Sequence, residues 1–191
     1  MKIILASKSP RRKELLSNMV DNFDIIESNY QEDMTLKLSN KDLVKELAFQ
    51  KANEVFSRTD GDRCVIGSDT IVVVNNKRAG KPKTKQEAKQ MLEELSGKSH
   101  FVYTGLSVII CRNGKKKCYN KVSSTKVFFK KLTNEEIQSY IDSGEPMDKA
   151  GAYGIQGYAG NFVKKIDGCY FSVVGLPTNL LYEILKKESI I

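Results

Sequence analysis

The sequence is poor in zinc-binding residues and in long apolar runs. Its four cysteines form no C-x-x-C pair, and it has only one histidine, His100. This combination excludes a structural zinc site made of His and Cys ligands. No segment approaches the ~20 apolar residues that a membrane-spanning helix needs, and the apolar start, Ile3–Ala6, is too short for the core of a signal peptide. We therefore expect a soluble protein with reduced thiols, located in the cytoplasm and without a membrane partner.

The sequence also lacks internal repeats and any linker rich in proline, glycine or serine. Its 191 residues fit one large domain, so we expect 1–191 to form a single domain. Lysine and arginine total 31 against 23 aspartate and glutamate, which gives a net charge of +8. This excess predicts an acidic partner but does not by itself distinguish a nucleotide from nucleic acid.

Signals for strands and helices alternate along the chain. A short apolar strand at Ile3–Ala6 precedes a helix predicted at Pro10–Asn18, with Ser9 as its N-cap and Pro10 at the first helical position. Capping patterns or prolines predict further helices after Ser39, Thr84, Thr133 and Pro177.

Turn signals within the strand-like segments predict two hairpins. Asn113-Gly114 lies in the middle of Ser99–Leu132, and Asp167-Gly168 separates Phe162–Ile166 from Cys169–Val174. Together with the helices, these segments predict an α/β fold, with a mixed twisted sheet and flanking helices.

Lys51 breaks the pattern of the second helix. Val44, Leu47, Ala48 and Val55 share one apolar face, and at 3.6 residues per turn Lys51 falls within that stripe. Its stem could cover the core while the ammonium reaches solvent. Alternatively, the helix aims a cation at bound negative charge.

Asp69 is a second anomaly, because it places a carboxylate inside the apolar run VIGSDTIVVV. Burying an unpaired charge is costly, so Gly67-Ser68-Asp69 forms a turn or bulge, or Asp69 belongs to a site. A carboxylate held at a strand edge suits a metal ligand or a general base.

The stretch LASKSPRRKELL predicts an anion site. Free backbone N–H groups at a helix start favour an anion, whereas positive charge in the first turn opposes the helix dipole. Two arginines, Arg11 and Arg12, nevertheless follow Ser7 and Ser9 there. Lys81, in AGKPKT before the third helix, is a further candidate phosphate ligand.

Other features are weaker candidates. The glycine-rich segment Gly151–Gly160 permits close approach of a ligand but lacks the strand and helix context of a dinucleotide site, so a surface loop is the simple interpretation. His100 is expected to be structural. The basic runs at 115–117, 130–131 and 186–187 resemble solvated hairpin tips and helix ends.

Several motifs, taken in their order along the chain, resemble those of the Maf family: LASKSPRRKELL, GSDT, GKPKT, LSGKSH, EPMDKAGAYGIQG and VVGLP. The resemblance extends from the first strand to the last helix. It implies an α/β fold similar to inosine triphosphate pyrophosphatases, with two lobes around a cleft. It also implies a hydrolase that uses Mg²⁺, which Mn²⁺ could replace, and releases a nucleoside monophosphate and pyrophosphate.

The resemblance also implies residue roles. Asp69 matches the family's proton acceptor or metal-binding acid. Glu32 in YQED, a looser form of the family's acidic pattern, matches a second acidic position, and both are the implied metal ligands. Ser68 stands where alanine is frequent. The implied phosphate-binding residues are Ser7, Ser9, Arg12, Lys51 and Lys81.

Three positions follow the family's division by substrate. Arg11, Thr70 and Gln156 resemble the branch that hydrolyses dTTP and UTP, whereas Trp, Gln and Glu are typical of the 7-methyl-GTP branch. The implied role is removal of non-standard or surplus pyrimidine nucleotides, and a homodimer is compatible with it.

Two other classes of function are compatible with parts of the sequence. A nucleotide-sensing regulator of cell division or septum formation needs the same cleft but no working acid. An RNA-binding module would fit the net charge, but the basic-aromatic motif is missing, so we expect no stable nucleic-acid partner.

Overall fold

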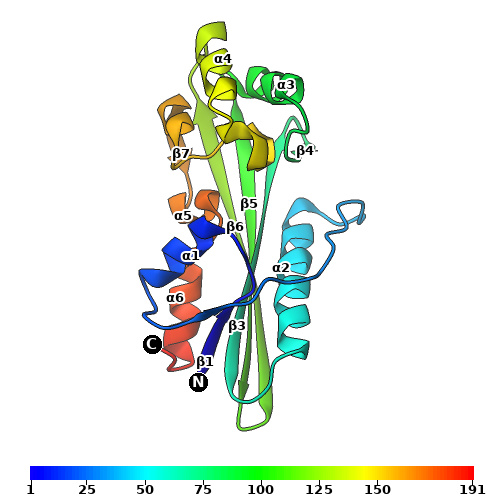
Figure 1. The fold of residues 1–191 in the computed structure, drawn as a ribbon, viewed down its shortest axis with the longest axis vertical. Coiled ribbons are helices and arrows are strands. Elements are labelled where there is room, and N and C mark those ends of the chain that lie inside the picture. Colours follow the sequence, from blue (N-terminus) through cyan, green and yellow to red (C-terminus); the bar gives the residue numbers. More distant parts are fainter. The chain divides into compact units, whose positions relative to one another are not determined.

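The computed structural model describes residues 1–191 (Figure 1). Its sheet has seven strands in the order β2-β1-β3-β5-β6-β7, with β4 paired to β3. The strands are β1 (Lys2–Leu5), β2 (Asp24–Ile25), β3 (Arg63–Val74), β4 (Lys77–Ala79), β5 (Ser99–Arg112), β6 (Lys115–Phe129) and β7 (Val163–Asp167). The α-helices are α1 (Pro10–Ser17), α2 (Asn40–Ser57), α3 (Lys85–Leu95), α4 (Asn134–Asp142), α5 (Tyr170–Val174) and α6 (Thr178–Lys187). This mixed sheet with flanking helices confirms the predicted fold class.

The chain forms two compact units, each assembled from separate stretches of sequence. Unit 1 comprises Met1–Asp69, Thr104–Ser123 and Gly175–Ile191, and unit 2 comprises Thr70–Tyr103 and Ser124–Val174. The long strands β3, β5 and β6 contribute residues to both. Because neither unit is a continuous segment, no linker could have marked the division in the sequence.

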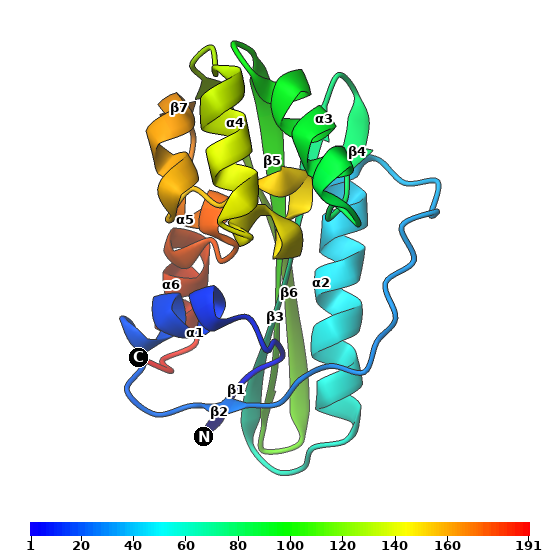
Figure 2. The ribbon, with the colours of Figure 1, turned by 45° about the horizontal axis from the view of Figure 1, so that its top comes forward.

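In unit 1, β1 pairs in parallel with both β2 and β3, with Ile4 opposite Asp24 and Val65. Helix α2 lies along one face of these strands, and α1 and α6 lie on the other (Figures 1 and 2). The apolar side chains between α2 and the strands include Ile4, Ala6, Ala52, Val55, Val65 and Ile109, which are fully or almost fully buried.

Two glycines let α2 approach the sheet closely. A Cβ atom on Gly67 of β3 would lie 2.4 Å from the Ala48 carbonyl oxygen, and one on Gly105 of β5 would lie 1.9 Å from the Val44 carbonyl oxygen. Both distances are too short for any side chain. The glycines therefore fix how near the helix that carries Lys51 comes to the strand that carries Asp69.

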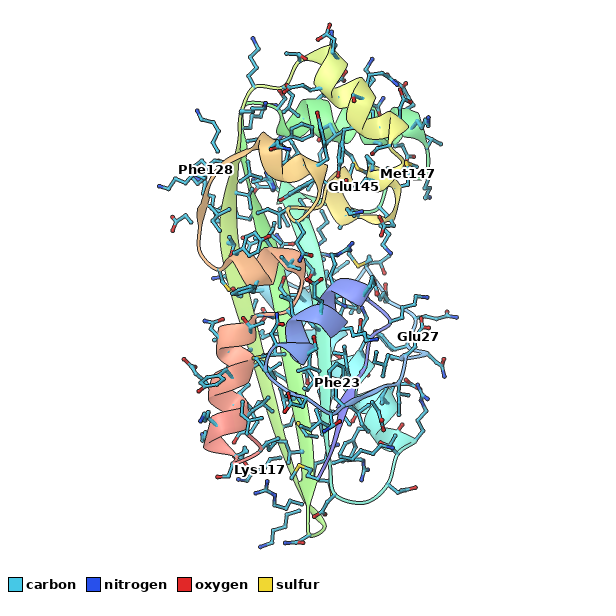
Figure 3. All side chains as sticks on the ribbon, turned by 60° about the vertical axis from the view of Figure 1, so that its left-hand side comes forward. Phe23, Glu27, Lys117, Phe128, Glu145 and Met147 are labelled. Carbon is cyan, nitrogen blue, oxygen red and sulfur yellow. The ribbon has the colours of Figure 1, made fainter.

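The end of α6 is tied to β6. Glu188, which follows α6, accepts hydrogen bonds from the Lys117 ammonium at 2.9 and 3.1 Å and from the Tyr119 hydroxyl. These contacts lower the pKa of Glu188. Lys117, labelled in Figure 3, thus has a partner, although the sequence suggested only a solvated hairpin tip.

Unit 2 has its own apolar core beneath α3 and α4. Its largest fully buried side chains include Tyr140 and Phe162. The turn between β3 and β4 uses Asn75 and Asn76, whose φ values of 47° and 62° are those of a type I′ hairpin turn. His100 is buried in this unit, where its Nε2 lies 2.7 Å from the Tyr153 hydroxyl.

The second predicted hairpin is wrong. Val163–Asp167 forms β7, but the following residues form helix α5 instead of a returning strand. Gly168 has φ of +131°, and the next residue, Cys169, donates its N–H to the Thr125 hydroxyl. That bond, and the one from Ser172 Oγ to the Cys169 carbonyl, stabilise a helical turn against the strand tendency of the sequence.

The glycine-rich segment is more regular than the predicted surface loop. The 3₁₀-helices η2 (Ala150–Ala152) and η3 (Tyr158–Phe162) overlap its two ends, and η1 (Glu145–Asp148) precedes it. Across the whole chain, no helix combines the length and apolarity that crossing a membrane would require.

Candidate active site

Helix α1 begins as the sequence predicts. Ser9 is its N-cap, with its hydroxyl oxygen 3.5 Å from the Arg12 N–H, and Pro10 occupies the first helical position. The Ser9 N–H in turn donates to the Ser7 hydroxyl at 3.2 Å. Two hydroxyl groups therefore lie at the start of the helix, where its free N–H groups favour an anion.

The Arg12 side chain is partly buried and hydrogen-bonded within unit 1. Its Nε donates to the Gly175 carbonyl at 2.8 Å, and a terminal nitrogen donates to the Ser7 hydroxyl at 3.3 Å. Burial lowers the pKa of Arg12, while the carboxylates of Asp69 and Glu32 oppose this effect. The guanidinium is thus held by neutral acceptors, within electrostatic reach of both acids.

The contacts of Lys51 explain why a lysine lies in the apolar stripe of α2. Its ammonium lies 2.5 Å from Asp69 Oδ1 and 2.6 Å from Glu32 Oε1, and only 12% of the side chain is exposed. A snorkelling lysine would have an exposed ammonium, so that alternative is wrong. Helix α2 instead aims the cation at two carboxylates.

Asp69, the acid within an apolar run, is buried and paired with Lys51. It lies within β3, which runs from Arg63 to Val74, so the alternative that Gly67-Ser68-Asp69 forms a turn is wrong. Its residue exposure is 4%, and burial raises the pKa of its carboxyl group, while Lys51 opposes the rise and Glu32 adds to it. A raised pKa makes a carboxylate a stronger base at neutral pH.

Gly175 was missed by the sequence reasoning, although its motif VVGLP was recognised. Its carbonyl oxygen lies 2.9 Å from the Ser68 hydroxyl and accepts the hydrogen bond from Arg12 Nε. Its φ of +126° is one that other residues rarely adopt. An isolated glycine before Leu-Pro was the only available signal. Ser68, noted only as a departure from alanine, also lies 2.8 Å from the Gly105 carbonyl.

Glu32 and Asp69 are the candidate ligands for a divalent cation. Nowhere in the chain do three or more His, Cys, Asp or Glu side chains form a metal-binding group. Glu32 and Asp69 do present two carboxylates to one cationic nitrogen, that of Lys51. Mg²⁺ is commonly held by one or two carboxylates, with water and substrate phosphates completing its shell. The donor set therefore fits a cation that binds together with a phosphorylated substrate.

The predicted residues fall in both units. Unit 1 brings together Ser7, Ser9, Arg12, Glu32, Lys51 and Asp69 through the contacts above, and Arg11 is near enough to Arg12 to lower its pKa. Unit 2 contains half-buried Thr70, exposed Lys81 after Gly80, and exposed Gln156. Thr70 directly follows Asp69 on β3.

In this α/β fold, an arginine, a lysine and a buried carboxylate lie close to the start of a helix. Such an arrangement is typical of proteins that bind phosphorylated ligands. Comparison with known proteins identifies the family. The model of the Maf family, described as Maf-like protein, matches residues 2–188. The chain belongs to this family, as its motifs predicted.

Two relatives and one solved structure illustrate the likeness. A dTTP/UTP pyrophosphatase from Thermoanaerobacter sp. (strain X514) is 50% identical over 188 residues, which cover 98% of this chain and 97% of the relative. A dTTP/UTP pyrophosphatase from Alkaliphilus oremlandii is 51% identical over 186 residues, which cover 97% and 95%. The Staphylococcus aureus Ham1 protein has the same fold, with a TM-score of 0.53 at 14% identity over 98% of this chain and 100% of that one.

Proposed function

We propose that this protein hydrolyses dTTP and UTP to the nucleoside monophosphate and pyrophosphate. The observation that carries the proposal is the buried carboxylate of Asp69, which shares the Lys51 ammonium with Glu32 close to the start of α1. Full-length relatives at about half identity that are named dTTP/UTP pyrophosphatase support it. The protein is accordingly a hydrolase of nucleotide phosphoanhydride bonds.

Glu32 and Asp69 would hold a divalent cation, Mg²⁺ or in its place Mn²⁺. When bound, such a cation neutralises phosphate oxygens and lowers the pKa of a coordinated water. Asp69 accepts the proton of the water that attacks a phosphoanhydride phosphorus in line with the departing oxygen. The raised pKa of the buried carboxyl suits this role, because a stronger base takes the proton more readily.

The phosphate groups would be bound by cations and helix N–H groups. Ser7 and Ser9 place hydroxyls at the start of α1, where the free N–H groups favour an anion. Arg12 and Lys51 supply positive charge from the same unit, and Lys81 supplies it from unit 2. These groups would neutralise the charge of the departing pyrophosphate.

Arg11, Thr70 and Gln156 would select the base. Gln156 is exposed on a turn, so its carboxamide is free to reach a ligand. A carboxamide offers a donor and an acceptor side by side, which matches the imide edge shared by uracil and thymine. Removal of non-standard or surplus pyrimidine nucleotides follows as the cellular role.

The four cysteines are free thiols, which fits a location in the cytoplasm.

The regulator and RNA-binding hypotheses gain no support. Nucleotide sensing needs no proton acceptor, whereas Asp69 is buried at a cost and kept beside Lys51. Relatives named as pyrophosphatases also favour turnover. We therefore keep the enzymatic function alone.

A nucleotide panel tests the proposal. Wild-type protein with Mg²⁺ should release pyrophosphate from dTTP and UTP in preference to purine triphosphates. Asp69→Asn should lose this activity, while Asp24→Asn, which changes an exposed partner of Lys2, should keep it. A preference for 7-methyl-GTP would overturn the roles of Arg11, Thr70 and Gln156, and full activity of Asp69→Asn would overturn the mechanism.

A further inference from the structure

The turn that carries Gln156 is short and tightly closed. The Gly157 N–H donates to the Gly154 carbonyl at 3.2 Å, so the four residues 154–157 form a turn with Gln156 at its third position. The turn follows buried Tyr153 and leads directly into η3. The position of the exposed Gln156 side chain therefore depends on how firmly the two ends of the turn are held.

Both ends are held by one chain of hydrogen bonds. The Gly154 N–H donates to the Tyr140 hydroxyl at 3.3 Å, and that hydroxyl donates to Glu145 Oε1 at 3.2 Å. Glu145 Oε2 then accepts the Tyr158 N–H, also at 3.2 Å. The Tyr140 ring is buried, whereas Glu145, labelled in Figure 3, is half-buried in η1. One carboxylate thus connects the residue that begins the turn to the residue that follows it.

The two glycines of the turn leave room for the side chains of Glu145 and Lys149. A Cβ atom on Gly157 would lie 2.0 Å from Glu145 Oε1, and one on Gly154 would lie 2.6 Å from Lys149 Cε. The Lys149 ammonium donates to the Glu145 carbonyl at 2.6 Å and contacts Asp148 Oδ1 at 2.7 Å. Glu145 is therefore fixed through its backbone as well as its carboxylate.

We propose that Glu145 is a positioning residue for base selection, and this rests on the proposed function of Gln156. A carboxamide can pair with the imide edge of uracil or, after exchange of its oxygen and nitrogen, with the edge of cytosine. Discrimination between the two bases requires a fixed carboxamide. Glu145 supplies this by holding residues 154–157, without itself contacting the nucleotide.

The test compares UTP with CTP. Glu145→Ala should lower the ratio of kcat/KM for UTP to that for CTP about tenfold, the discrimination that one bidentate base contact provides. The kcat for UTP should change much less, because the phosphate-binding residues and Asp69 are untouched. Glu145→Gln, which can still accept the Tyr158 N–H, should retain most of the ratio. Glu94→Ala, which alters an exposed glutamate of α3, is the matched control.

Two further variants and a binding assay keep the test decisive. Gly157→Ala forces the Glu145 carboxylate away, and Tyr140→Phe breaks the chain of hydrogen bonds, so each should lower the ratio in the same direction. The ratio of dissociation constants for α,β-imido UTP and α,β-imido CTP reports base selection without turnover. Unchanged ratios in all folded variants would overturn the inference. A wild-type protein that binds the UTP analogue selectively but releases no pyrophosphate would overturn the proposed function and leave the test of Glu145 in force.

Discussion

The ammonium of Lys51 lies 2.5 Å from Asp69 Oδ1 and joins a lysine in the apolar stripe of α2 to an acid within β3. Lys51 breaks the apolar pattern of α2, and Asp69 breaks that of β3. The ion pair between them explains both exceptions. A buried ion pair is seldom a net source of stability, since desolvation offsets its attraction. The presence of this pair in unit 1 therefore supports the functional role that we propose for both residues.

Lys51→Ala should lower kcat for dTTP by two to three decades. One electrostatic group of this kind stabilises a transition state by about 3–4 kcal/mol. The measurement is pyrophosphate release at saturating dTTP. Lys45→Ala, on the same helix, removes a partly exposed lysine paired with Asp42 and should leave kcat unchanged. Equal effects of the two substitutions would show that α2 needs positive charge in general and would contradict the role of Lys51.

Chelation of divalent cations should abolish activity, and Mg²⁺ or Mn²⁺ should restore it. The ion pairs predict a further effect, because the Lys51 ammonium pairs with both Glu32 and Asp69 and so competes with a cation for their oxygens. Lys51→Met should therefore strengthen Mn²⁺ binding to the nucleotide-free protein, as measured by electron paramagnetic resonance of free Mn²⁺. Weaker or unchanged binding would refute competition between the ammonium and the cation. Lys45→Met is the control.

Several residues of the candidate site were predicted from the sequence because they violate local rules. Lys51 in an apolar stripe and Asp69 in an apolar strand were detectable by periodicity alone, and the serine cap of α1 by its pattern. The partner of Lys51 was not detectable, because Asp69 is 18 residues away in sequence and only the packing of α2 on β3 brings them together.

Other features could not be predicted for related reasons. The hairpin expected at Asp167-Gly168 failed because Thr125, far away in the sequence, accepts the Cys169 N–H and stabilises a helix instead. Gly175 contributes a backbone carbonyl, and a carbonyl leaves no signature in the residue type. Glu145 accepts the Tyr158 N–H only because the fold brings η1 and the turn at 154–157 together, and its motif alone did not indicate this contact.

Gly105→Ala should destabilise the protein and lower its activity together. The added methyl group would lie 1.9 Å from the Val44 carbonyl oxygen, so α2 must move away from β5. Overpacking of this kind costs about 1–3 kcal/mol, and the shift of α2 would also carry Lys51 away from Asp69. Thermal unfolding and kcat report the two effects. Gly80→Ala, where a Cβ atom meets nothing within 4 Å, should leave the melting temperature unchanged, and an equal loss there would contradict the packing argument.

The buried His100 should make stability fall with acidification. Burial lowers the pKa of His100 from 6.5 to about 4, so between these values the unfolded chain binds a proton that the folded protein does not. The free energy of unfolding should therefore decrease as the pH falls from 6.5 towards 4, by up to about 3 kcal/mol from this group. Urea unfolding at several pH values measures the slope. His100→Leu removes the titrating group, so its slope in this window should be shallower by about one proton, and an unaltered slope would show that His100 accepts a proton in the folded state.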